Sequence, residues 1–208
     1  MWPVDFKGVQ ISDTSNWRKK SYPQLPLIED QKIVREIKTL EDQAELTTIF
    51  TEKSVDFINE NKDNPFFLFY ASPIPHAPLQ APKKLINKYR DIIGEEEPYL
   101  GNVGYFPTRY PRATYAAMIE YIDIQVGEIV EQLKRLNIYD NTIILITSDN
   151  GPTYAGGVDF EYFNSTGIFQ NDPKRMKGYT YEGGVRVPFI ISWPQKIKKG
   201  RLINDISI

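Results

Sequence analysis

The sequence predicts an α/β fold in which a largely parallel sheet is flanked by helices and is incomplete at both ends of the chain. Short apolar runs typical of buried strands alternate with longer segments of helical periodicity, a pattern typical of parallel sheets. The chain has 208 residues, which suits one domain. Its last segment, 201–208, alternates apolar and polar residues and stops without a cap, which favours a strand cut short.

The first third of the chain reads as loop, helix and strand. Residues 1–30 are rich in Pro, Ser, Asn and aromatic residues, which favours an irregular lead-in, and 31–38 fits a short strand or a turn of helix. Residues 43–61 carry apolar side chains near helical spacing. The continuous apolar run 66–71 favours a strand buried on both faces, and the proline-rich stretch 72–78 a stiff loop.

Two more helices and two more strands are expected in the rest of the chain. Tyr115, Met118 and Leu133 belong to an apolar stripe at helical spacing, and Gly183-Gly184 precedes the last apolar run. We expect, in order, a short helix over 82–93, an irregular insertion over 94–111, a long helix over 113–136, a strand over 142–147, a loop over 153–177 and a strand over 185–193.

Composition excludes several function classes. The formal net charge is −2, so the chain lacks the basic excess of a nucleic-acid-binding protein. It has no cysteine, and therefore no disulfide framework, thiolate metal site or cysteine nucleophile. No apolar run approaches the roughly 18 residues that span a membrane, and residues 1–10 do not resemble a signal peptide.

Polar residues follow two of the expected strands, where ligands bind in open α/β sheets. His76, the only histidine, follows the first strand, and Asp149 and Asn150 with Gly151 follow the second. Asp and Asn oxygens suit Ca²⁺ or Mg²⁺, and the basic, glycine-flanked stretch around Lys177 could hold an anion. Each feature also has a plain alternative: an ordinary turn, a surface histidine and a solvated basic loop.

Four stretches, in this order and at this spacing, resemble the sulfatase family. They are P-F-F-L-F-Y-A at 65–71, P-H-A-P at 75–78, T-S-D-N-G-P at 147–152 and K-G-Y-T-Y-E-G-G-V-R-V-P at 177–188. The long helix matches as well, through Tyr115, Glu120, Asp123, Val126 and Gly127. The resemblance covers residues 25–208 and implies that 1–208 is a partial catalytic domain, the middle to later part of an arylsulfatase-like enzyme of the alkaline-phosphatase-like superfamily.

The resemblance implies a role for four residues. Asp149 and Asn150 match calcium ligands, Lys177 matches a lysine that contacts the sulfate, and His76 matches the histidine near the leaving-group oxygen. These roles suit the chemistry, because fixed positive charge stabilises a sulfuryl transition state. An imidazole can protonate the departing alkoxide.

The resemblance also implies parts that this chain lacks. The family's Cys- or Ser-x-Pro-x-Arg motif, whose first residue becomes the formylglycine nucleophile, and two early aspartates lie upstream, and a C-terminal subdomain follows. Ser192 and Pro194 have the Ser-x-Pro spacing, but Lys196 stands where the motif needs arginine. We therefore expect no nucleophile in this chain, and no activity from it alone.

The resulting function hypothesis is a sulfuric ester hydrolase acting on a sulfated small molecule or carbohydrate. The resemblance implies calcium, a formylglycine-generating system, and a periplasmic, extracellular or lysosomal location. The alternatives are a phosphate or phosphonate ester hydrolase, which would want more than one histidine, a non-catalytic truncated product, or an unrelated α/β domain. Aromatic residues of the 94–111 and 153–175 loops could stack on a substrate ring or serve as ordinary packing: Tyr99, Tyr105, Phe106, Tyr110, Tyr154, Phe160 and Tyr162.

Overall fold

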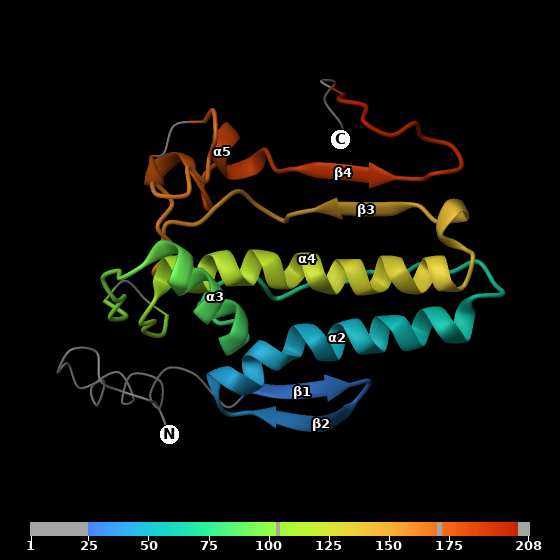
Figure 1. Ribbon diagram of the computed structural model, residues 1–208, viewed down its shortest axis with the longest axis horizontal. Helices are drawn as coiled ribbons and strands as arrows, with labels where there is room; N and C mark the ends of the chain where they lie inside the picture. The colour runs from blue at the N-terminus through green and yellow to red at the C-terminus, as the bar shows by residue number, and fades with distance from the viewer. Residues whose placement is uncertain (1–24, 103–104, 170–171, 204–208) are drawn as a thin grey trace.

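Two long helices form the centre of the molecule. The computed structural model describes residues 25–102, 105–169 and 172–203. Helices α2 (Leu40–Asn61) and α4 (Pro111–Arg135) pack together, and α3 (Lys83–Ile93) packs on α4. In Figure 1 a hairpin lies below α2 and a second pair of strands lies above α4. The helices expected over 43–61, 82–93 and 113–136 are thereby confirmed, with ends shifted by a few residues.

The hairpin precedes α2. Strand β1 (Leu25–Glu29) pairs antiparallel with β2 (Lys32–Ile37). The strand alternative for 31–38 is confirmed, whereas an irregular lead-in is wrong for residues 25–29. These residues form a strand because they pair with β2, and a reading of the 1–30 composition does not reveal that pairing. The remainder of the lead-in, 1–24, lies outside the described residues.

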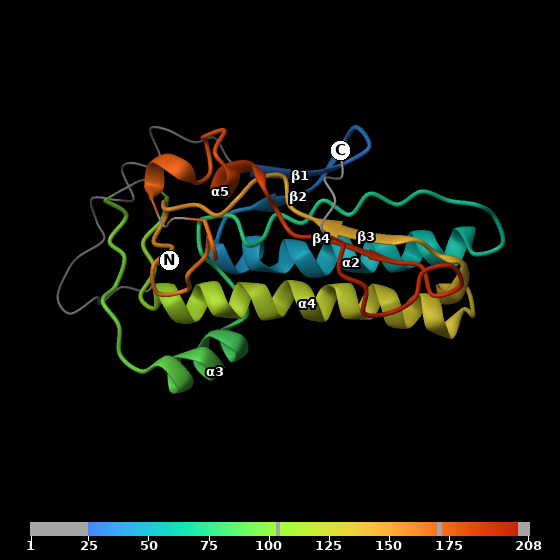
Figure 2. The same cartoon turned by 90° about the horizontal axis from the view of Figure 1, so that it is seen from above.

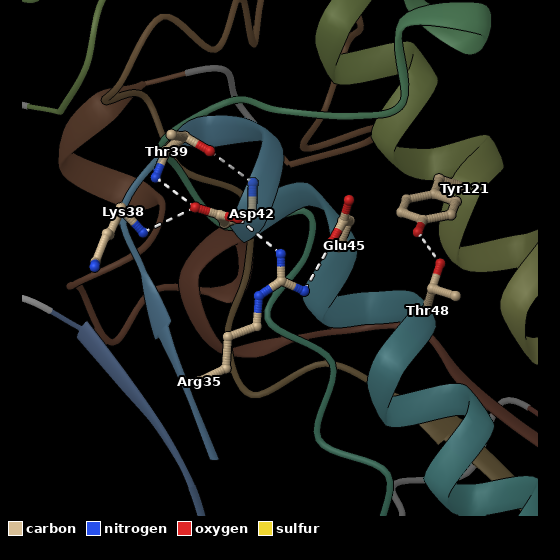
Figure 3. Close-up of polar contacts among 7 residues, drawn as sticks. All are labelled: Arg35, Lys38, Thr39, Asp42, Glu45, Thr48 and Tyr121. Atoms are coloured by element: carbon tan, nitrogen blue, oxygen red, sulfur yellow. Dashed lines mark hydrogen bonds and ion pairs between the residues drawn. The ribbon is translucent and has the colours of Figure 1, made fainter. Parts of the chain in front are cut away.

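A capping box fixes the start of α2 (Figure 3). The Thr39 hydroxyl accepts a hydrogen bond from the Asp42 amide at 3.0 Å, and the Asp42 carboxylate accepts one from the Thr39 amide at 2.9 Å. The same carboxylate accepts from the Lys38 amide and from the Arg35 guanidinium. The donors around the carboxylate lower the pKa of Asp42 to about 2, the Lys38 amide having the largest effect.

The core lies where α3 and α4 meet the segment after residue 72. Met118 and Ala117 of α4 are fully buried, and the hydroxyls of Tyr121 and Thr48 join α4 to α2 by a hydrogen bond (Figure 3). Met118 and Leu133 of the expected α4 stripe are buried. The core cluster consists of Ile74, Leu79, Ala81, Ala117, Met118, Tyr121 and Val158.

The run 66–71 is not a buried strand, and that expectation is wrong. The chain returns here from the end of α2 to the start of α4 (Figures 1 and 2), and no described strand pairs with it. Phe66 packs edge-on against Phe57 of α2, and the Tyr70 hydroxyl hydrogen-bonds Thr51. Phe67 is 85% exposed. Alternate side chains therefore face α2, and the other half of the apolar run points outward.

The second pair of strands is antiparallel, so a largely parallel sheet is wrong for the described residues. Strand β3 (Ile144–Thr147) pairs with β4 (Phe189–Ser192) in antiparallel register. Parallel neighbours need a crossover of a dozen or more residues, usually helical. In the described part of residues 148–188, which join these strands, the only helical elements are a 3-10 turn and the four-residue helix α5 (Glu182–Val185), so β4 begins at the end where β3 finishes.

The remaining expectations concern the loops and the end of the chain. Residues 94–102 and 105–110 form no helix or strand, and an isolated bridge pairs Tyr99 with Thr108. Residues 201–203 form no strand, and 204–208 lie outside the described residues. Among the helices of the described part, none combines the length and apolarity needed to cross a bilayer.

The pKa of Asp42 gives a testable pH dependence. Because this pKa is lowered from 3.8 to about 2, the stabilisation is complete above pH 4 and is lost as the pH falls toward 2. Asp42→Asn should lower Tm above pH 4, and the difference from wild type should shrink as the pH falls to 2. Thermal unfolding followed by circular dichroism checks it.

Glu41→Gln is the matched control for this prediction, since Glu41 lies in the same first turn outside the capping box. It should have a smaller effect at every pH. A difference between Asp42→Asn and wild type that stays constant from pH 4 to pH 2 would contradict the assignment.

Candidate functional site

The turn after β3 is held against the segment before β4 by a contact between two backbones. The Gly151 amide donates to the Gly184 carbonyl at 2.8 Å. A Cβ on Gly151 would lie 2.0 Å from the Gly183 carbonyl oxygen, and one on Gly184 would lie 2.1 Å from the Tyr179 oxygen. The chain therefore needs glycine on both sides of this contact.

A second backbone bond joins Lys177 to the same turn. The Lys177 amide donates to the Pro152 carbonyl at 3.0 Å. Two bonds thus join the residues after β3 to the stretch 176–184. Asp149, Asn150 and Lys177, which the sequence analysis singled out separately, are brought to one end of the molecule, which we call the strand-end corner. Figures 1 and 2 place it near the start of α4.

The side chains of the strand-end corner are available for a ligand. Asp149 is exposed and its carboxylate forms no hydrogen bond or ion pair with any described residue. The Asn150 side-chain amide donates to the Gly151 carbonyl at 2.9 Å, which leaves its oxygen free to accept. The half-buried Lys177 ammonium likewise has no carboxylate partner within the described ranges. The corner thus combines two oxygen donors with one cation.

The donor set of the corner suits a hard cation but does not complete a site. Carboxylate and amide oxygens are the ligands that Ca²⁺ prefers, and it takes about six to eight of them. No group of three or more His, Cys, Asp or Glu side chains is placed to hold a metal among the described residues. Asp149 and Asn150 can therefore hold part of a calcium ion's coordination shell, and other oxygens must supply the rest.

His76 lies on the proline-rich loop 72–78, outside the strand-end corner. Its Nδ1 lies 2.7 Å from the Ala77 carbonyl oxygen, and its ring contacts Tyr105 edge-on at 5.7 Å between centroids. Because a carbonyl oxygen only accepts, this bond places a proton on Nδ1 and leaves Nε2, on an exposed residue, with no hydrogen-bond partner among the described residues. The loop packs tightly against Gly156, since a Cβ on Gly156 would lie 2.6 Å from the Ala77 Cβ. No hydrogen bond joins His76 to the corner within the described residues.

A cavity of about 750 Å³ opens beside Gly156, and no motif in the sequence indicates it. Its walls come from three stretches, 95–102, 111–112 and 154–161. The E-E-E run at 95–97 and the G-G pair at 156–157 were the available signals. Neither signal shows by itself that the stretches meet, because this depends on packing between distant parts of the chain.

The sulfatase family model matches residues 5–207 of the chain. The chain is similar to human N-acetylgalactosamine-6-sulfatase, with 29% identity over 90% of this chain and 32% of the relative. It is 31% identical to N-acetylgalactosamine-6-O-sulfatase of Bacteroides thetaiotaomicron over 79% of this chain and 29% of that protein. The chain thus spans about a third of the length of these curated relatives.

Solved structures agree with the family match. Ps i-CgsB, crystallised with k-i-k-neocarrahexaose, aligns with a TM-score of 0.59 and 31% identity, over 89% of this chain and 36% of that one. PsFucS1 sulfatase from Pseudoalteromonas sp. aligns with a TM-score of 0.54 and 27% identity, over 79% and 28%. The sulfatase neighbours support an alkaline-phosphatase-like α/β fold. By its motifs, its fold and the extent of this match, the chain belongs to the sulfatase family.

Proposed function

We propose that the protein carrying this chain hydrolyses sulfate monoesters, and that the chain supplies part of the metal site and the sulfate-binding and leaving-group side chains. The observation that carries the proposal is the pair of backbone bonds from Gly151 to Gly184 and from Lys177 to Pro152. They bring two oxygen donors and an unpaired ammonium together. A sulfuryl group needs such positive charge as its ester bond breaks.

Each side chain has one task in this scheme. Asp149 and Asn150 hold the cation, and the Lys177 ammonium binds the sulfuryl oxygens. His76, with Nδ1 fixed by the Ala77 carbonyl, directs Nε2 toward the departing oxygen and, as imidazolium, gives it the proton that an alcohol requires. When bound, calcium supplies positive charge, and a formylglycine outside this chain supplies the nucleophile.

A sulfated carbohydrate is the substrate class that we favour. Two curated relatives are named for sulfate on N-acetylgalactosamine, and one structural neighbour was crystallised with a carrageenan oligosaccharide. The proposal includes a formylglycine-generating system as maturation partner and a periplasmic, extracellular or lysosomal location.

The metal assignment is tested with Asp149→Ala in the complete natural protein, matured with a formylglycine-generating system. Mutation of a residue that only supports a metal ligand lowers metal affinity or activity by about 10- to 100-fold. Loss of a direct ligand should therefore lower kcat/KM for 4-nitrophenyl sulfate by about 100-fold or more. Calcium titration of chelator-treated protein should show weakened binding. Asp63→Ala, an exposed aspartate at the end of α2, is the control. Unchanged turnover and calcium affinity would refute the assignment.

The role of His76 is tested by comparing leaving groups. His76→Ala should lower kcat by about 10²- to 10⁴-fold for a sugar sulfate, whose alkoxide needs a proton, because general acids contribute about that much. The loss should be much smaller for 4-nitrophenyl sulfate, whose phenolate leaves unaided. Equal losses for the two esters would argue against proton donation.

The backbone contact that carries the proposal is tested with Gly151→Ala. Its Cβ would meet the Gly183 carbonyl oxygen, so we expect a loss of about 1–3 kcal/mol in the free energy of unfolding. Calcium affinity should fall as well, because Asp149 and Asn150 would shift. Chemical denaturation and calcium titration measure the two effects.

Gly127→Ala in α4 is the matched control for this variant. A Cβ added at Gly127 would meet no atom within 4 Å. It should therefore stabilise the helix by about 0.5–1 kcal/mol. If Gly151→Ala were as stable as Gly127→Ala, the close approach of the two backbones would not be a constraint.

A further inference from the structure

The cavity beside Gly156 adjoins the loop that carries His76. Gly156 lines the cavity and packs against Ala77 and against Tyr105, whose ring contacts His76. Tyr154, which also lines it, follows Gly151 by three residues along the chain. If the reacting oxygen of a ligand lies near His76, the adjoining part of the same ligand would therefore reach the cavity. At about 750 Å³ the cavity lies within the range of small-molecule sites.

The walls of the cavity are fixed by specific contacts. The Glu96 side chain is 7% exposed, and its carboxylate accepts from the Arg112 and Ala113 amides at 2.6 and 3.1 Å, at the start of α4. Arg112 pairs with Asp159 at 2.7 Å, which joins the third wall to the same helix. The ring of Tyr99 covers Gly157, where a Cβ would lie 2.8 Å from it. The cavity is thus formed before any ligand binds.

The chemistry of the lining selects the kind of ligand. Five carboxylates line the cavity; two of them are paired with guanidiniums, Asp159 with Arg112 and Glu95 with Arg109, and the other three leave the lining negative. Carboxylates only accept hydrogen bonds, so the lining favours donors and repels anions. The Glu161 side chain has no partner among the described residues, and Tyr154, 41% exposed, adds an aromatic face. The five carboxylates belong to Glu95, Glu96, Glu97, Asp159 and Glu161.

We propose that this cavity binds an uncharged, hydroxyl-rich sugar ring that neighbours the sulfated ring, and that its carboxylates disfavour a second sulfate at that position. Sugar hydroxyls donate to the carboxylates, and the apolar face of the ring packs on the Tyr154 ring. The inference rests on the proposed function for the placement of the sulfated ring near His76.

Binding of an uncharged galactose disaccharide to the complete natural protein tests the cavity without requiring any hydrolysis. Titration calorimetry should give an affinity about fivefold weaker for Tyr154→Ala, since one aromatic contact is worth about that much. Glu52→Lys on α2, an exposed glutamate outside the cavity, should bind like wild type. Equal affinities for wild type and Tyr154→Ala would overturn the proposal.

The charge selectivity is tested with two substrates, a disaccharide carrying one sulfate and the same disaccharide with a second sulfate on the adjoining ring. Wild type should prefer the monosulfated substrate in kcat/KM. Glu161→Lys should raise the ratio for disulfated over monosulfated substrate by about five- to tenfold, because it replaces repulsion by attraction. Glu52→Lys makes the same charge change and should leave the ratio unaltered.

The two measurements separate failure of this inference from failure of the proposed function. An unmoved ratio in Glu161→Lys would overturn the proposed charge selectivity. A wild-type protein that hydrolyses no sulfate ester would refute the proposed function, and the disaccharide titration would still decide whether the cavity binds a sugar.

Discussion

The candidate site depends on a contact in which two backbones approach more closely than any side chain permits. Gly151 and Gly184 share a 2.8 Å hydrogen bond. A Cβ on either residue would clash with a backbone carbonyl oxygen. This contact and the bond from Lys177 to Pro152 hold the turn after β3 against the stretch before β4, and without them the two segments would separate. Asp149 and Lys177 would then belong to unrelated loops, and a cation on Asp149 would not lie beside an anion on Lys177.

The helical core fixes the other side of the site. Ile74 and Leu79 are 5% and 2% exposed, and they flank the exposed His76 within the same short loop. Burial of the flanking residues against α4 holds the loop, while the imidazole Nε2 stays accessible. The end of the molecule where α4 begins thus combines a rigid base with exposed polar side chains, an arrangement typical of functional sites.

Local signals predicted the helices and the positions of β2, β3 and β4, but they did not predict which strands pair or in which direction. The spacing of Met118 and Leu133 identifies α4 because helical periodicity is written into neighbouring residues. The run 66–71 has the composition of a buried strand, yet whether a strand pairs depends on segments far away in sequence. The direction of β4 likewise depends on the path of the loop before it. The residues of the strand-end corner were found through motifs, while their common location came only from the structure.

The cavity could not be predicted from the sequence, because its walls lie far apart along the chain. Its three walls are separated by up to about 60 residues, and no single stretch carries a recognisable pattern. Glu96 is an example: in the sequence it is one of three consecutive glutamates, and in the structure it caps α4 from a distance through two amides. Packing, rather than residue type, gives it this role.

A crystal structure of the complete natural protein, soaked with calcium and sulfate, tests the central claim most directly. The account predicts a cation bound by oxygens of Asp149 and Asn150, with a sulfate oxygen within hydrogen-bond distance of the Lys177 Nζ. A cation bound elsewhere, with Asp149 exposed to solvent, or a sulfate remote from Lys177 would contradict it.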